Sequence, residues 1–140
     1  MDLSIFETSK FSTEGVVMNI KNPLTGEDLT HKSKEDTEER VMYIKVLGSD
    51  STKFQIAVQR LNSAKTQANK PKTEMEVAND KRKMAHILTS ITVDGLVFLD
   101  KQWVQITSAN AFDVYLRMDF LASQVMEFAT DRANFMPASA

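Results

Sequence analysis

Residues 107–135 read TSANAFDVYLRMDFLASQVMEFATDRANF and contain two short amphipathic helical patterns, one directly after the other. The first helix is predicted to begin at Thr107 or Ser108, and Asp119 is a suitable N-cap for the second. In both patterns apolar residues recur every three or four positions, which predicts that one face of each helix packs against a core. These residues are Phe112, Tyr115 and Leu116 in the first helix and Leu121, Val125, Phe128 and Ala129 in the second. Nothing in the stretch indicates catalysis.

Two β-strands are predicted in the first third of the chain, at residues 16–20 and 41–47. In both, apolar side chains alternate along the segment, as in a strand with one face on a core. The alternating residues are Val16, Met18 and Ile20 in the first strand and Met42, Ile44 and Val46 in the second. Residues 22–26, NPLTG, predict a turn, because Pro fixes φ and Gly permits a positive φ.

The segment between these strands is strongly polar. Residues 31–40 read HKSKEDTEER and include no apolar side chain. Such a segment has nothing to bury against a core. We therefore expect an exposed loop that is the most mobile internal part of the chain.

Two longer helices are predicted in the middle of the chain. Residues 48–51, GSDS, form a turn with N-cap candidates, and Thr73 with Glu76 forms a capping box. The first helix is expected to end near residues 69–71. Its inner face is Phe54, Ala57, Val58, Leu61, Ala64 and Ala68, and that of the second is Val77, Met84, Leu88 and Ile91.

The stretch after the second of these helices has two interpretations. Asp94-Gly95 predicts a turn. Residues 96–106 then form either a short hairpin around Asp100-Lys101 or an ordered loop pinned by Phe98 and Trp103.

Together these patterns predict an α+β fold in a single domain over residues 1–140. A small N-terminal antiparallel sheet or hairpin occupies residues 1–48. A bundle of about four short helices follows in residues 49–137.

Composition argues against an enzyme, a metal site or a cofactor. The chain has no cysteine, and its two histidines, His31 and His86, have no metal-ligand neighbour at helical spacing. The four glycines are scattered singly, so there is no phosphate-binding loop. The N-terminus lacks a basic start followed by a long apolar run, and no apolar run approaches membrane-spanning length. We expect a cytoplasmic protein with no catalytic residues.

Charge is unevenly distributed along the chain. Residues 51–106 carry nine Lys or Arg against five Asp or Glu, whereas both flanking regions are acidic. This basic band is either a solvated helical face or a patch for an acidic partner. A nucleic-acid partner is not expected, because beyond Phe54 no aromatic residues are interleaved with the basic ones for base stacking.

The order of several segments resembles that of the tail assembly chaperones of long-tailed bacteriophages and prophages. The segments are NPLTGEDL (22–29), GSDSTKFQIA (48–57), the Asp94-Gly95 pair, TSANAFDVYLR (107–117) and FLASQVMEFATDRANF (120–135). The resemblance implies a helper that binds the tape measure protein, recruits major tail tube subunits in the host cytoplasm, and is absent from the mature virion. It leaves room for a homo-oligomer. The partner-binding residues expected on this basis are Phe112, Tyr115, Leu116, Leu121, Val125 and Phe128.

Two other functions fit the same patterns. A structural tail or neck (completion) protein retained in the virion could join a ring through strand addition by its β-rich half. A nucleic-acid binder would use the basic band and show salt-dependent DNA binding.

Overall fold

The computed structural model describes residues 2–61 and 73–137. Its main feature is a four-stranded antiparallel sheet in the order β1-β4-β5-β6. The strands are β1 (Val16–Asn19), β4 (Tyr43–Val46), β5 (Thr92–Leu99) and β6 (Gln102–Ile106). Ala64, Ala68 and the expected helix end at residues 69–71 lie outside the described residues.

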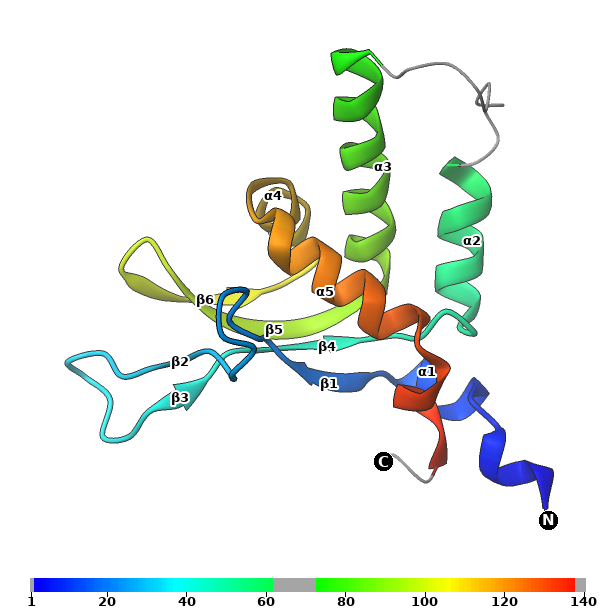
Figure 1. Ribbon diagram of the computed structural model, residues 1–140, viewed down its shortest axis with the longest axis horizontal. Helices are drawn as coiled ribbons and strands as arrows, with labels where there is room; N and C mark the ends of the chain where they lie inside the picture. Colours follow the sequence, from blue (N-terminus) through cyan, green and yellow to red (C-terminus); the bar gives the residue numbers. More distant parts are fainter. Residues whose placement is uncertain (1, 62–72, 138–140) are drawn as a thin grey trace.

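Helices α3, α4 and α5 cover one face of the sheet, and α2 lies beside α3 (Figure 1). The short α1 and the two 3-10 helices, from the first and last parts of the described chain, lie at one end of the sheet (Figure 1). The bounds are η1 (Leu3–Phe6), α1 (Ser9–Glu14), α2 (Thr52–Leu61), α3 (Glu74–Ile91), α4 (Ala111–Arg117), α5 (Asp119–Thr130) and η2 (Arg132–Phe135). The α+β class is confirmed, but the order of elements differs. Half of the sheet, β5 and β6, follows α3, whereas we expected the sheet within residues 1–48 and a mainly helical part after it.

The two strands predicted in the first third of the chain, β1 and β4, follow the predicted alternation. Met18 lies opposite Ile44, and both are buried on the helix side, while Val17 on the other face is 52% exposed. The predicted turn at 22–26 is present, with the Gly26 N–H donating to the Asn22 carbonyl at 2.8 Å and Gly26 at φ 76°. Alternation and turn chemistry are local properties, and here they were sufficient to predict the two strands and the turn from the sequence.

The predicted turn at Asp94-Gly95 is wrong. Helix α3 ends at Ile91 and β5 begins at the next residue, so Gly95 lies within the strand, opposite Ile44. A Cβ there would lie 2.8 Å from the Tyr43 carbonyl oxygen and 3.1 Å from Ile44 Cγ1. Glycine is therefore required by the close approach of β4.

The hairpin interpretation of residues 96–106 is confirmed. Strands β5 and β6 pair around Asp100 and Lys101, whose φ angles are 53° and 66°. Two consecutive positive φ angles are typical of a type I′ turn, whose twist matches that of the strands. The Arg117 guanidinium holds this turn by two hydrogen bonds of 2.6 Å to the Asp100 carboxylate.

The helix caps and inner faces predicted from the sequence are confirmed only in part. Ser51 and Thr73 cap α2 and α3 through hydrogen bonds from the N–H groups of Phe54 and Glu76. Leu88 and Ile91 are buried as expected. The inner-face assignment of Val77 and Met84 is wrong, since they are 47% and 39% exposed. The N-terminal half of α3 extends beyond the sheet, so the face of α3 continues where there is no core to cover it (Figure 1).

The caps predicted for the last two helices are also wrong. Helix α4 begins after Asn110 and α5 after Met118, and neither start has a side-chain cap. The Asn110 amide instead donates to the Gln105 carbonyl at 2.8 Å, turned back toward β6. Asp119 forms an exposed ion pair with Lys81 at 3.0 Å.

Residues 31–40 are mostly exposed, as predicted, but they also bury some side-chain surface. They are part of a small hairpin of β2 (Thr30–His31) and β3 (Arg40–Val41). The His31 ring stacks on Phe98 at 3.7 Å between centroids, and the Arg40 guanidinium lies 4.7 Å from the centre of the Trp103 ring. Trp103 Nε1 donates to the Asp36 carboxylate at 2.8 Å. The polar segment therefore covers aromatic side chains on the face of the sheet opposite the helices.

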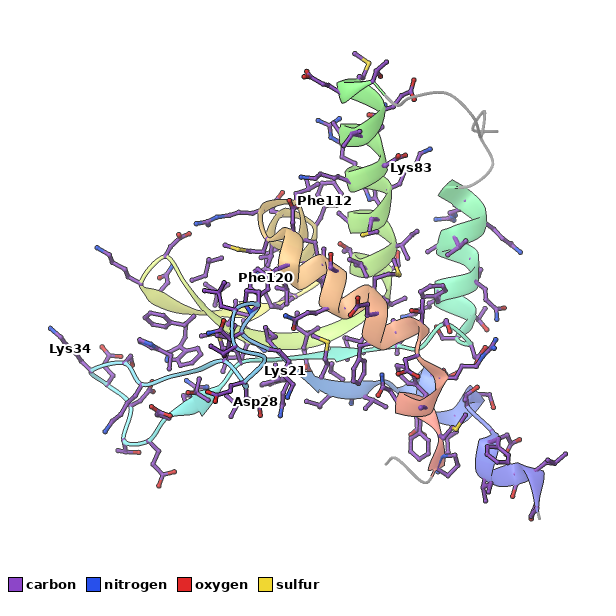
Figure 2. All side chains as sticks on the ribbon, viewed as in Figure 1. Lys21, Asp28, Lys34, Lys83, Phe112 and Phe120 are labelled. Carbon is purple, nitrogen blue, oxygen red and sulfur yellow. The ribbon has the colours of Figure 1, made fainter. Side chains whose placement is uncertain are left out.

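The Trp103–Asp36 contact can be tested, because Trp103 is the single tryptophan of the chain. Asp36→Ala removes the acceptor, so we expect the tryptophan emission to shift to the red. We also expect faster trypsin cleavage after Lys34, at the far tip of the hairpin (Figure 2). Glu38→Ala, an exposed carboxylate on the same segment, is the control. Equal emission and cleavage in both variants would contradict the contact.

Acid titration gives the same test in the unaltered protein. Hydrogen bonds from the Ser33 N–H and then from Trp103 lower the pKa of Asp36 below its ordinary 3.8. A carboxyl group with a lowered folded-state pKa stabilises the fold above the ordinary value and loses this effect as the pH falls through the folded-state pKa. The red shift of tryptophan emission should therefore begin only below pH 3.8.

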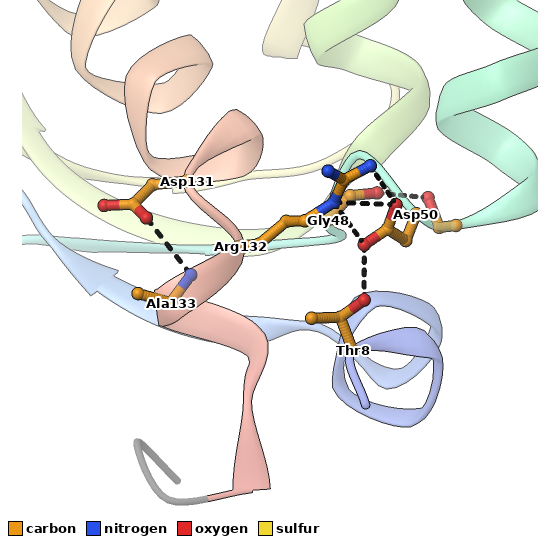
Figure 3. Close-up of polar contacts among 7 residues, drawn as sticks. Thr8, Gly48, Asp50, Asp131, Arg132 and Ala133 are labelled. Atoms are coloured by element: carbon orange, nitrogen blue, oxygen red, sulfur yellow. Dashed lines mark hydrogen bonds and ion pairs between the residues drawn. The ribbon is translucent and has the colours of Figure 1, made fainter. Parts of the chain in front are cut away.

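The two ends of the chain meet at the turn of residues 48–51 (Figure 3). The Gly48 N–H donates to the Ser12 carbonyl at 3.0 Å, and the Ser49 N–H donates to the Ala129 carbonyl at 2.8 Å. The Asp50 carboxylate accepts from Thr8 Oγ1 and from the Arg132 guanidinium, whose Nε lies 3.1 Å from Oδ2. Both hydrogen bonds lower the pKa of Asp50, and the bond from Arg132 has the larger effect. The turn thus joins α1, β4, α2 and the end of α5.

Gly48 should be the least tolerant position of this turn. A Cβ there would lie 2.9 Å from Ser12 Cβ and 3.0 Å from Phe135 Cγ, both of them buried residues. Gly48→Ala should therefore lower the free energy of unfolding by ~1–3 kcal/mol, measured by denaturant titration.

Ser12→Ala is the matched comparison. The buried Ser12 hydroxyl has no hydrogen-bond partner among the described residues. Its removal should leave the free energy of unfolding unchanged or raise it. A Gly48→Ala variant as stable as Ser12→Ala would contradict this packing.

Candidate protein-binding surfaces

The structure divides the six predicted partner-binding residues into two groups. Tyr115, Leu121 and Val125 are at most 3% exposed and belong to the core. Phe112, Leu116 and Phe128 are half-buried at its rim. Phe112 points from α4 toward α3, where its ring lies 4.4 Å from that of His86, whereas Phe128 contacts Phe135 near the C-terminus (Figure 2). The six do not form one exposed surface.

Tyr115 shows why part of this set is structural. Its hydroxyl lies 2.6 Å from Thr92 Oγ1, which donates its own proton to the Leu88 carbonyl at 2.7 Å. Tyr115 must therefore donate to Thr92, since a threonine hydroxyl has one proton. Burial raises the pKa of Tyr115 to about 12, so the phenol stays protonated and ties α4 to the end of α3.

Two leucines of the set form a matched pair. Leu121 is 3% exposed and Leu116 is half-buried. Leu121→Ala should lower the free energy of unfolding by ~2–5 kcal/mol, because it leaves a cavity in the core. Leu116→Ala, the same chemical change at the rim, should cost less. Denaturant titration of both variants measures the difference, and equal losses would contradict the division.

A groove lies between α2 and α3. It encloses about 530 Å³ and is lined by Lys53, Ile56, Ala57, Arg60, His86 and Ser90. The α2 residues recur at three- and four-residue spacings, so a single face of α2 forms one wall. Ile56 is 47% exposed in this groove. Met75, 74% exposed, lies three turns before His86 on the same face of α3.

The charge of this groove comes from Lys53 and Arg60 of α2. The basic band seen in the sequence thus lies partly along a groove with apolar side chains. No local sequence signal identifies this groove, because it depends on how α2 and α3 pack together. Exposed apolar side chains also cluster on η1, at Leu3, Ile5 and Phe6.

A second groove runs between the free edge of β1 and α5 and encloses about 440 Å³. Its walls include Val17 and Asn19 of the strand and Glu127, Phe128 and Asp131 at the end of α5. At one end the Gln124 amide bonds to both backbone groups of Lys21. It accepts from the Lys21 N–H at 2.9 Å and donates to the Lys21 carbonyl at 2.7 Å.

Several carboxyl groups in the described ranges 2–61 and 73–137 have shifted pKa values. Five aspartates there have lowered pKa values, each through hydrogen bonds that favour the carboxylate: Asp2, Asp28, Asp36, Asp50 and Asp100. A general acid would need a raised pKa. In the same ranges no group of three or more His, Asp or Glu residues is arranged to hold a metal ion.

The helices that the structure describes include none long and apolar enough to cross a membrane. Comparison of the chain with known protein families, with curated proteins and with solved structures finds no match. The structure thus defines the molecule as an α+β domain with grooves between α2 and α3 and beside the edge of β1.

Proposed function

We propose that this protein is a tail assembly chaperone of a long-tailed phage or prophage. In this role it binds the tape measure protein in the host cytoplasm, helps recruit major tail tube subunits, and leaves before the virion is complete. It catalyses no reaction. The sequence resemblance suggests this family, and the α2–α3 groove supports the binding role.

The observation that carries the proposal is the concave, partly apolar surface between two helices. A tape measure protein exposes apolar helix stripes until the tube encloses them, and such patches aggregate unless they are covered. A client helix in the α2–α3 groove would pack on Ile56 and Ala57 and reach Met75. Methionine adapts to varied apolar partners because its side chain is flexible and polarizable.

The charges of the groove specify the client further. Lys53 and Arg60 lie on the α2 wall, on either side of Ile56. A client helix with acidic residues beside its apolar stripe would place opposite charges against them. Complementary charge of this kind speeds association and fixes orientation.

Co-expression with the tape measure protein tests the proposal. The unaltered protein should raise the soluble fraction of the tape measure protein several-fold. Ile56→Glu should abolish most of this gain, because it places a carboxylate in the apolar part of the groove. Its melting temperature should stay close to that of the unaltered protein, since Ile56 is 47% exposed.

Gln59→Glu is the control for Ile56→Glu, since it adds the same charge to an exposed position of α2 that does not line the groove. If Ile56→Glu still solubilised the tape measure protein, the α2–α3 groove would not be the binding site. Mass spectrometry of purified phage particles distinguishes the proposed chaperone function from the alternative, a structural protein of the virion. A chaperone should be missing from them, whereas a structural tail or neck protein would be retained.

A further inference from the structure

The free edge of β1 presents unpaired backbone groups. The Ile20 N–H donates to the Met42 carbonyl at 3.0 Å, so the even-numbered residues of this strand face β4. In an antiparallel pair the intervening residues face the other way. The N–H and C=O groups of Val17 and Asn19 therefore point away from the sheet. No described residue forms a hydrogen bond to them on that side.

Gln124 shows that this edge accepts a partner. The next outward-facing residue, Lys21, has both its N–H and its C=O bonded by the Gln124 amide. A neighbouring strand would form this same pair of bonds. The protein thus closes one position of the edge with a side chain of α5, and the two positions before it stay open.

The groove beside the open positions is acidic. Glu127 and Asp131 line it from α5. Two cations near it are paired elsewhere, Lys21 with Asp28 and Arg132 with Asp50 (Figures 2 and 3). Between the carboxylates, the half-buried Phe128 supplies apolar surface.

We propose that the β1 edge and α5 form a docking site for an extended, basic segment of another protein. The segment adds as a strand beside β1, with hydrogen bonds to the backbone of Val17 and Asn19. A Lys or Arg side chain on its helix-facing side meets Glu127 and Asp131, and an apolar side chain two residues away, on the same face, packs on Phe128. The α2–α3 groove takes a helix and shares no lining residue with this site, so the two sites are independent.

Charge favours a basic partner over a second copy of this chain. Pairing two β1 edges would place the Glu127 and Asp131 carboxylates of one copy near those of the other. Like charges brought together in this way disfavour the complex.

The test uses the full chain and the acetylated peptide Thr-Lys-Thr-Val-Thr-Lys-Thr, in which Lys and Val lie on the same face of a strand, with a second peptide that has Glu in place of Lys. Amide NMR signals are followed at low ionic strength, where charge is least screened. We expect the lysine peptide to shift the Val17 and Asn19 signals and to bind at least about tenfold more tightly than the glutamate peptide. Absence of binding, or equal affinity for both peptides, would overturn the proposal.

Val17→Pro tests the backbone bonds. Proline is tolerated where the lost N–H points away from the sheet, so the β1–β4 pairing should survive. Affinity for the lysine peptide should fall at least about tenfold, whereas Val17→Thr, which keeps the N–H, should bind normally. Unchanged binding by Val17→Pro would mean that the peptide does not add as a strand.

Glu127→Lys tests the charge and does not depend on the folding of the proline variant, because Glu127 is exposed. The preference for the lysine peptide should disappear, while solubilisation of the tape measure protein through the α2–α3 groove should be unchanged. Concentration-dependent dimerisation that shifts the Val17 and Asn19 signals without peptide would instead identify a second copy as the occupant, and would overturn the proposal.

Discussion

The turn of residues 48–51 fixes α5, and both the core and the β1 groove depend on where α5 lies. The Ser49 N–H and the Asp50 carboxylate bond to Ala129 and Arg132, at and beyond the end of the helix. Gln124, in the middle of α5, bonds to the backbone of Lys21. The helix is therefore held along the free edge of β1 at two places. Gly48 permits this arrangement because Ser12 and Phe135 leave no room for a side chain.

The sheet limits access to its edges with side-chain amides. Gln124 bonds to the β1 edge, and the Asn110 amide donates to the Gln105 carbonyl on the edge of β6. Unpaired edges invite association with other strands, and proteins commonly block them. The open positions of β1 lie in an acidic groove, which restricts the strands that can pair there. The α2–α3 groove has basic side chains instead, so the two proposed binding surfaces differ in charge.

Features set by neighbouring residues could be predicted from the sequence, whereas features set by distant contacts could not. The alternation in β1 and β4, the turn at Gly26 and the caps at Ser51 and Thr73 are local. The conformation of residues 31–40 depends on a distant contact, because Trp103, which donates a hydrogen bond to Asp36, lies 67 positions from it in the sequence. The exposure of Met84 depends on where the sheet ends. The same helical spacing describes Leu121 in the core and Leu116 at the rim, so periodicity could not separate core from binding residues.

Methionine oxidation by hydrogen peroxide tests the α2–α3 groove most directly, because three methionines differ in position. Met75 is 74% exposed on α3, three turns before the groove residue His86, Met84 is 39% exposed beside a different hollow, and Met18 is buried. In the complex with the tape measure protein, Met75 should be protected strongly, Met84 should stay reactive, and Met18 should be unreactive in both states. Equal oxidation of Met75 in the free protein and in the complex would contradict the proposed binding surface.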